Sequence, residues 1–201
     1  MRRVGLVVVG LLLVSRLADA AEKQVRPWVG VTFAGSTSFV DLDHAAGKPH
    51  VAIGVDAAVL GNIFGLEVDL GRMPGFFQTG TAPLGQSPLV LHSSVTTLTG
   101  SVVVAAPRKL TEYTLRPYFV AGAGGMRVRT DDYLGLLKVR DTVGAINLGG
   151  GVIGFRTNRV GVAWDVRRFS SVKGPTYGSG TSLGARQLSF CRANMALAIR
   201  Y

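Results

Sequence analysis

Charged side chains recur at alternating positions within apolar segments of this chain, and these are the residues that could do chemistry. Residues two apart in an extended strand share a face. In the segment 63–70, for example, large apolar residues alternate with Glu67 and Asp69. In several such segments we expect the charged residues to lie on the face that points to the interior of the fold. These residues are Asp56, Glu67, Asp69, Arg127, Asp165, Arg167, Arg192 and Arg200. Acids and bases on one face predict a paired charge network, because buried charges are tolerated only when they are paired.

Such a network has two interpretations. It could provide a proton path, an ion path or a gate, or it could fill and lock the inside of a barrel. A small barrel leaves room for little beyond side chains, which favours the second interpretation. We expect Asp165 and Arg167 to anchor the network together with Glu67 and Arg192.

Two other motifs could bind a cofactor or a metal. The run Gly149–Gly154 matches the glycine spacing of a dinucleotide loop, but that loop must lie between a strand and a helix, and here a further strand is expected. Asp41, Asp43, His44 and His50 offer ligands for a cation, but they lie in a loosely spaced segment that contains glycine. We predict no cofactor and no metal site.

Residues 1–20 have the organisation of a secretory signal peptide. The segment begins with basic residues and continues with an apolar run over 4–14. It ends with a cleavage site at Ala18-Asp19-Ala20. The run is too short to span a membrane, and Arg16 interrupts its end. We predict cleavage after Ala20, which leaves residues 21–201 as one exported domain.

The exported part predicts an all-β fold, because clusters of Gly, Asn, Asp and Pro separate its β-branched and alternating segments. We expect strands over about 27–34, 51–60, 63–70, 91–105, 115–128, 143–155, 160–169 and 188–201. Long and short connections alternate strictly. In an up-and-down barrel, alternate connections lie at opposite ends, so the long loops share one rim and the short turns share the other with both termini.

The final segment has one apolar face that ends in an aromatic residue. Met195, Leu197, Ile199 and Tyr201 share this face. Arg192, Asn194 and Arg200 share the other. An apolar outer face and a charged inner face suit the wall of a membrane barrel.

In these features the chain resembles the small eight-stranded outer-membrane barrels of the OmpA/OmpX type. The resemblance rests on the residues 116–124, 146–152 and 159–169. It implies an antiparallel up-and-down transmembrane barrel without the soluble peptidoglycan-binding domain of the longer members. It also implies that Met195, Leu197, Ile199 and Tyr201 form a C-terminal signal for the barrel-insertion machinery.

A histidine and a serine two residues apart, His92 and Ser94, deserve a separate check. Some outer-membrane barrels hydrolyse lipid A with a His and a Ser on one strand. A nucleophilic serine needs a base, and usually an acid that orients the base. The sequence identifies no third member, and Val95 stands where those enzymes have Asn. We therefore predict no catalytic residues and no enzyme activity.

The net charge of +10, which becomes +8 without the signal segment, predicts an affinity for polyanions. Nucleic acid is an unexpected partner for an exported protein. Outer-membrane lipid, including phosphorylated lipopolysaccharide, is the expected one. The segment 129–142 mixes three bases with three acids, which argues against a strong phosphate site in that loop.

The sequence thus predicts a barrel in a bacterial outer membrane with a structural or interaction role, a filled lumen and long extracellular loops. Two alternatives remain open. The barrel could be a narrow channel or a small-ligand carrier. It could also be a soluble periplasmic lipocalin-like binder, although such a barrel would place its apolar residues inside.

Overall fold

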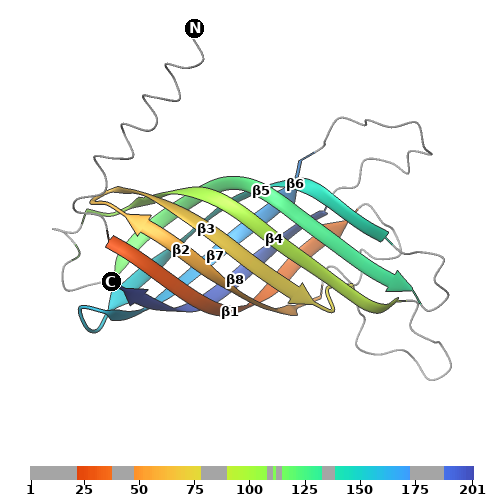
Figure 1. Cartoon of the computed structure of the whole chain (residues 1–201), viewed down its shortest axis with the longest axis horizontal. Coiled ribbons are helices and arrows are strands. Elements are labelled where there is room, and N and C mark those ends of the chain that lie inside the picture. The colour runs from red at the N-terminus through yellow and green to blue at the C-terminus, as the bar shows by residue number, and fades with distance from the viewer. Residues whose placement is uncertain are drawn as a thin grey trace, which may run out of the picture.

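The computed structural model describes residues 22–37, 48–77, 90–107, 111, 115–132, 139–172 and 188–201, which form one closed barrel (Figure 1). Its strands are β1 (Glu22–Thr37), β2 (His50–Leu60), β3 (Phe64–Pro74), β4 (Val90–Ala105), β5 (Arg116–Asp132), β6 (Val139–Phe155), β7 (Val160–Ser171) and β8 (Leu188–Arg200). Each strand pairs antiparallel with the next, and β8 pairs with β1. The barrel therefore has no free sheet edge, and the predicted eight-stranded up-and-down architecture is confirmed.

The observed strands cover the expected segments and extend several of them toward the rims. The largest addition is at the start of β1, which begins at Glu22. Smaller additions carry β3 to Pro74 and β5 to Asp132 and start β6 at Val139. Apolar and polar residues alternate only in the part of a strand that has the apolar surroundings on one side and the barrel interior on the other. The backbone ladder continues beyond it, because main-chain hydrogen bonds do not depend on the side chain.

The two ends of the barrel differ. We call one end the terminal rim, which holds the ends of strands at Glu22, Leu60, Arg116 and Arg200 together with the short connections. We call the opposite end the loop rim, which holds Thr37, Pro74, Asp132 and Ser171. Figure 1 shows the chain's C-terminus at the terminal rim. Within the described ranges, no helix is long and apolar enough to cross a membrane.

The wall is apolar outside, and its interior holds the buried charged residues together with apolar ones. Exposed and buried residues alternate along β3 and along β7 as far as Phe169, with Leu66, Val68 and Trp164 among those that face outward. The inward positions include Glu67 and Asp165, which are buried. A soluble barrel shows the opposite arrangement.

One strand, β5, has its two faces the other way round from the sequence interpretation. Tyr118, Val120 and Met126 are buried in the interior, whereas Phe119 is 73% exposed on the outer wall. Arg127 is also exposed on the outer wall, so its predicted place in the interior network is wrong. The outer face of β5 consists largely of small residues such as Ala121, so the larger apolar side chains on the inner face resemble a lipid-facing set.

Candidate functional site: the charged barrel interior

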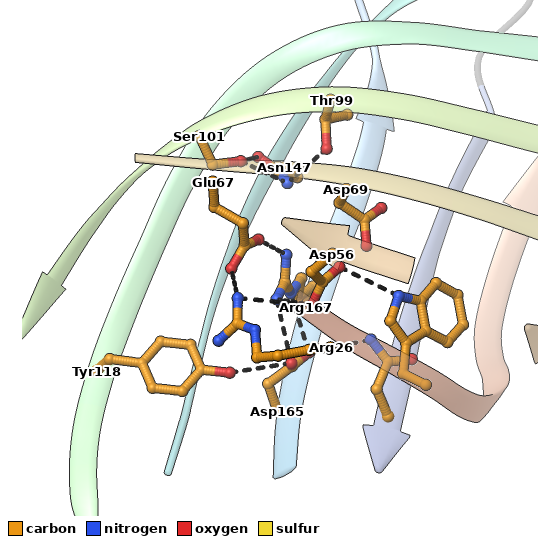
Figure 2. Close-up of polar contacts among 12 residues, drawn as sticks. Arg26, Asp56, Glu67, Asp69, Thr99, Ser101, Tyr118, Asn147, Asp165 and Arg167 are labelled. Carbon is orange, nitrogen blue, oxygen red and sulfur yellow. Dashed lines mark hydrogen bonds and ion pairs between the residues drawn. The ribbon is translucent and has the colours of Figure 1, made fainter. Parts of the chain in front are cut away.

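At the centre of the lumen, one glutamate from β3 is bound by two arginines from other strands (Figure 2). Glu67 accepts hydrogen bonds from Arg26 of β1 and from Arg167 of β7. Arg167 also donates from Nε and Nη2 to the two carboxylate oxygens of Asp165, at 2.9 and 3.1 Å. Asp56 lies 3.5 Å from Arg26 and 3.6 Å from Arg167. We call these five residues the central cluster.

Uncharged side chains donate further hydrogen bonds to the carboxylates of the central cluster. The hydroxyl of Tyr118 donates to Asp165 at 3.0 Å, and Asn194 donates to the same carboxylate at 3.1 Å. The indole of Trp28 donates to Asp56 at 3.1 Å. Hydrogen bonds to a charged group are stronger than neutral ones, so these donors contribute to holding the central cluster together.

A second ion pair lies beside the central cluster. Arg192 of β8 donates to both oxygens of Asp69 of β3, at 3.2 and 2.6 Å. Its guanidinium stacks on the ring of Trp28 at 4.0 Å and on that of Phe169 at 4.7 Å, which adds cation–π attraction. The structure therefore divides the expected group of four, because Arg192 pairs with Asp69 beside the central cluster.

A third group closes the terminal rim. Arg200 pairs with Glu22, and its guanidinium lies 3.7 Å from the ring centre of Phe155. Arg116 donates to the backbone oxygens of Ala106, Gly61 and Asn62. Arg200 is thus an interior charge, as expected, but it belongs to this rim group and not to the central cluster.

Aromatic side chains fill the lumen toward the loop rim. Phe76 packs against Phe77 and Phe190 with ring centres 5.0 and 5.3 Å apart, and Phe169 stacks on Phe190 at 5.2 Å. All four rings are buried. The turn that brings Phe76 inward requires a left-handed residue, which Gly75 supplies with a φ of 70°. We call these four residues the aromatic plug.

The fold and the polar lumen agree with a comparison of the sequence with known families. The model for the outer membrane protein beta-barrel domain matches residues 4–190. The chain belongs to this family. The predicted resemblance to small eight-stranded outer-membrane barrels is thereby confirmed.

Solved structures of other outer membrane barrels share the fold. Neisserial surface protein A is 15% identical, with a TM-score of 0.56 over 89% of this chain and 98% of that one. OprG from Pseudomonas aeruginosa is 11% identical, with a TM-score of 0.52 over 90% of this chain and 96% of that one. At these identities the likeness concerns the fold alone. No curated protein matches the sequence.

Sequence reasoning missed several interior residues of this outer membrane barrel. Arg26 was not predicted because the first strand was expected to begin at Pro27. It lies two residues before Trp28, which faces the interior. Extending that alternation by one step would have found it. Glu22 and Arg116 lie at strand ends, where no alternating run marks their face.

The other motifs lie outside the interior site. Gly149–Gly154 lies within β6, and β7 follows, so the run lacks the strand-to-helix setting of a nucleotide loop. Asp41, Asp43 and His44 fall outside the described residues, among which no cluster of potential metal ligands occurs.

The candidate hydrolytic pair lies near the loop rim, on β4. Ser94 is half-buried, and the β4–β5 register places His92 opposite Asp131. The side chains of His92 and Asp131 fall outside the described ones.

Replacing Tyr118 by Phe should lower the free energy of unfolding by about 1.5–3 kcal/mol, the usual value of a hydrogen bond to a charged group. The hydroxyl donates to Asp165 inside the lumen, so its loss leaves that carboxylate with fewer donors. Urea unfolding of the barrel in detergent micelles, followed by gel mobility, measures the change. Phe119→Leu on the exposed face of the same strand is the control, and an equal loss there would contradict the role of the hydroxyl.

Proposed function

We propose that this outer membrane barrel has a structural or interaction role, with a closed lumen and with its long connections displayed outside the cell. The observation that carries the proposal is the set of buried arginines that join strands across the interior. Arg26, Arg167 and Arg192 are each at most 1% exposed. Each of the three forms an ion pair with a carboxylate of β3, which is Glu67 for Arg26 and Arg167 and Asp69 for Arg192.

The interior leaves little room for a path along the axis. Glu22 with Arg116 and Arg200 occupies the terminal rim, the central cluster follows, and the aromatic plug occupies the side of the loop rim. An eight-stranded barrel is just wide enough for its own side chains to fill it. These features support a wall locked by its interior charges and a surface function carried by the loops.

A narrow channel is the second candidate, because charged side chains follow one another from the terminal rim to Asp69. Insertion of the purified barrel into planar lipid bilayers separates the two functions. We expect no stepwise currents from the unmodified protein under applied voltage. Regular single-channel steps that require the inserted protein would instead support the channel and would contradict the closed lumen.

Export by a cleaved signal is part of this proposal. Residues 1–20 lie outside the described residues, and residues 21–201 would form the mature barrel domain. The intact mass of the protein from the outer-membrane fraction should correspond to a chain that begins at Ala21. A mass that includes residues 1–20 would contradict cleavage.

Insertion is proposed to depend on the exposed face of β8. Met195, Leu197, Ile199 and Tyr201 all face outward there, with Tyr201 71% exposed. The same strand pairs with β1 and so closes the barrel. This placement supports their recognition by the barrel-insertion machinery, with outer-membrane lipid as the surrounding partner.

A further inference from the structure

A group of arginines lies on the outside of the barrel near the loop rim. Arg72 of β3 and Arg127 and Arg129 of β5 are all exposed on the outer wall. We call these three residues the outer basic patch. In the strand register, Arg72 lies opposite Thr96 of β4, and Thr96 lies opposite Arg127. The patch therefore forms one continuous surface over β3, β4 and β5.

This surface lies at the edge of the apolar wall. One step toward the terminal rim, the outward residues are Leu70 on β3, Leu98 on β4 and Gly125 on β5. Each of these strands thus changes from apolar to basic or hydroxyl-bearing at the same row. Such a change near the rim on neighbouring strands is typical of the boundary between lipid tails and head groups, where an outward arginine has little cost.

The side chains of Arg72, Arg127 and Arg129 lie apart from the interior charge network. Among the described residues, none of them has an ion pair or a hydrogen bond. Arg127 and Arg129 are about 7 Å apart along β5, and Arg72 and Arg127 are about 10 Å apart across the sheet, from the usual strand dimensions. Guanidinium groups bind phosphate through two parallel hydrogen bonds. The hydroxyls of Ser94 and Thr96 add donors between the arginines.

The spacing favours a ligand with more than one phosphate. Three arginines offer more guanidinium groups than one phosphate can neutralise, so a head group with a second phosphate gains further charge-assisted hydrogen bonds. At the other end of the same wall, β3 and β5 carry the exposed Phe64 and Phe119, so the outward-facing arginines of these two strands lie only near the loop rim.

We propose that the outer basic patch binds the phosphorylated head group of an acylated glycolipid of the lipid A class, in the outer leaflet. The acyl chains lie along the apolar wall below the patch. The inference rests on the proposed placement of the barrel, with the loop rim outside the cell. The ligand thus joins the barrel to the leaflet that surrounds it.

The test uses the complete mature barrel in micelles of an uncharged detergent. Native mass spectrometry counts bound diphosphorylated lipid A, with monophosphorylated lipid A and phosphatidylglycerol as comparison lipids. We expect the affinity for diphosphorylated lipid A to fall about fivefold for each of R72Q, R127Q and R129Q, and about a hundredfold for the triple variant. The unmodified barrel should bind monophosphorylated lipid A and phosphatidylglycerol more weakly.

A matched control removes the same charge elsewhere. Lys23, Arg156 and Arg159 are exposed at or next to the terminal rim, and the triple variant K23Q, R156Q and R159Q should bind lipid A as the unmodified barrel does. An equal loss in this control, or equal binding of phosphatidylglycerol, would overturn the assigned site. So would an unmodified barrel that binds no lipid A.

Gel mobility before and after heating separates failure of this site from failure of the barrel itself. A protein that retains its heat-dependent shift but binds no lipid A refutes the lipid site alone. A protein that is recovered in the soluble periplasmic fraction without a shift refutes the membrane placement on which the site depends.

Discussion

Replacing Arg167 by Met is expected to lower the free energy of unfolding by about 3–5 kcal/mol, the loss found when one partner of a buried ion pair is removed. Arg167 contacts Glu67 and Asp165, and it lies close to Asp56. Without it, Arg26 is the remaining arginine in the central cluster. The acids would be left enclosed without sufficient positive charge, which is expensive in the barrel interior.

The neighbouring arginine supplies the control. Arg168 is exposed on the outer wall, so Arg168→Met should change stability by no more than about 0.5 kcal/mol. Denaturant unfolding in micelles, read by gel mobility, measures both variants. The double variant Arg167→Met, Glu67→Gln should lose less than the sum of its parts, because it removes one of the charges left unpaired. Equal stability of the two methionine variants would show that the central cluster does not lock the wall.

Replacing Gly54 by Val is expected to destabilise the barrel by about 3 kcal/mol, at the upper end of the usual range for overpacking. Gly54 lies opposite Gly71 in the β2–β3 register, and both glycines approach the ring of Trp28. A Cβ at Gly54 would overlap that ring and the backbone oxygen of Leu70. The ring of Trp28 would have to move away from its stacking on Arg192, and the backbone of β3 at Leu70 would have to shift as well.

An outward glycine provides the matched substitution. A Cβ at Gly100 on β4 would meet nothing within 4 Å. Gly100→Val should therefore be neutral, or stabilising by up to about 1 kcal/mol, since valine favours strands. Unfolding midpoints compare the two variants, and the emission of Trp28 in a Trp164→Phe background reports whether the indole has moved. An unshifted Trp28 and a similar midpoint for both variants would refute the proposed close packing.

The number of strands and the alternation of loops could be read from the sequence, because both depend on local patterns. The alternation in β3 and β7 is strong enough to place Glu67, Asp165 and Arg167 on the inner face without knowledge of any neighbour. Export and membrane insertion were expected from the ends of the chain. Family membership then agreed with the predicted barrel.

The faces of β5 were decided only by the tertiary structure. Its alternation is weak, since small residues such as Ala121 and Ala123 stand on the outer face and Tyr118 stands inside. Pairing with β4 and β6 fixes the orientation, because a strand held between two neighbours must present its faces in phase with theirs. The resulting outward position of Arg127 is what brings it into one row with Arg72.

Likewise, the sequence placed acids and bases on one face but could not assign partners. Glu67 meets Arg26 and Arg167, whereas Arg192 meets Asp69 two residues further along β3. The stagger of the strands around the closed barrel decides which charged residues form pairs. The stagger results from the hydrogen-bond register of all eight strand pairs. The periodicity of each strand therefore determined which side chains enter the lumen, and closure of the barrel decided which of them touch.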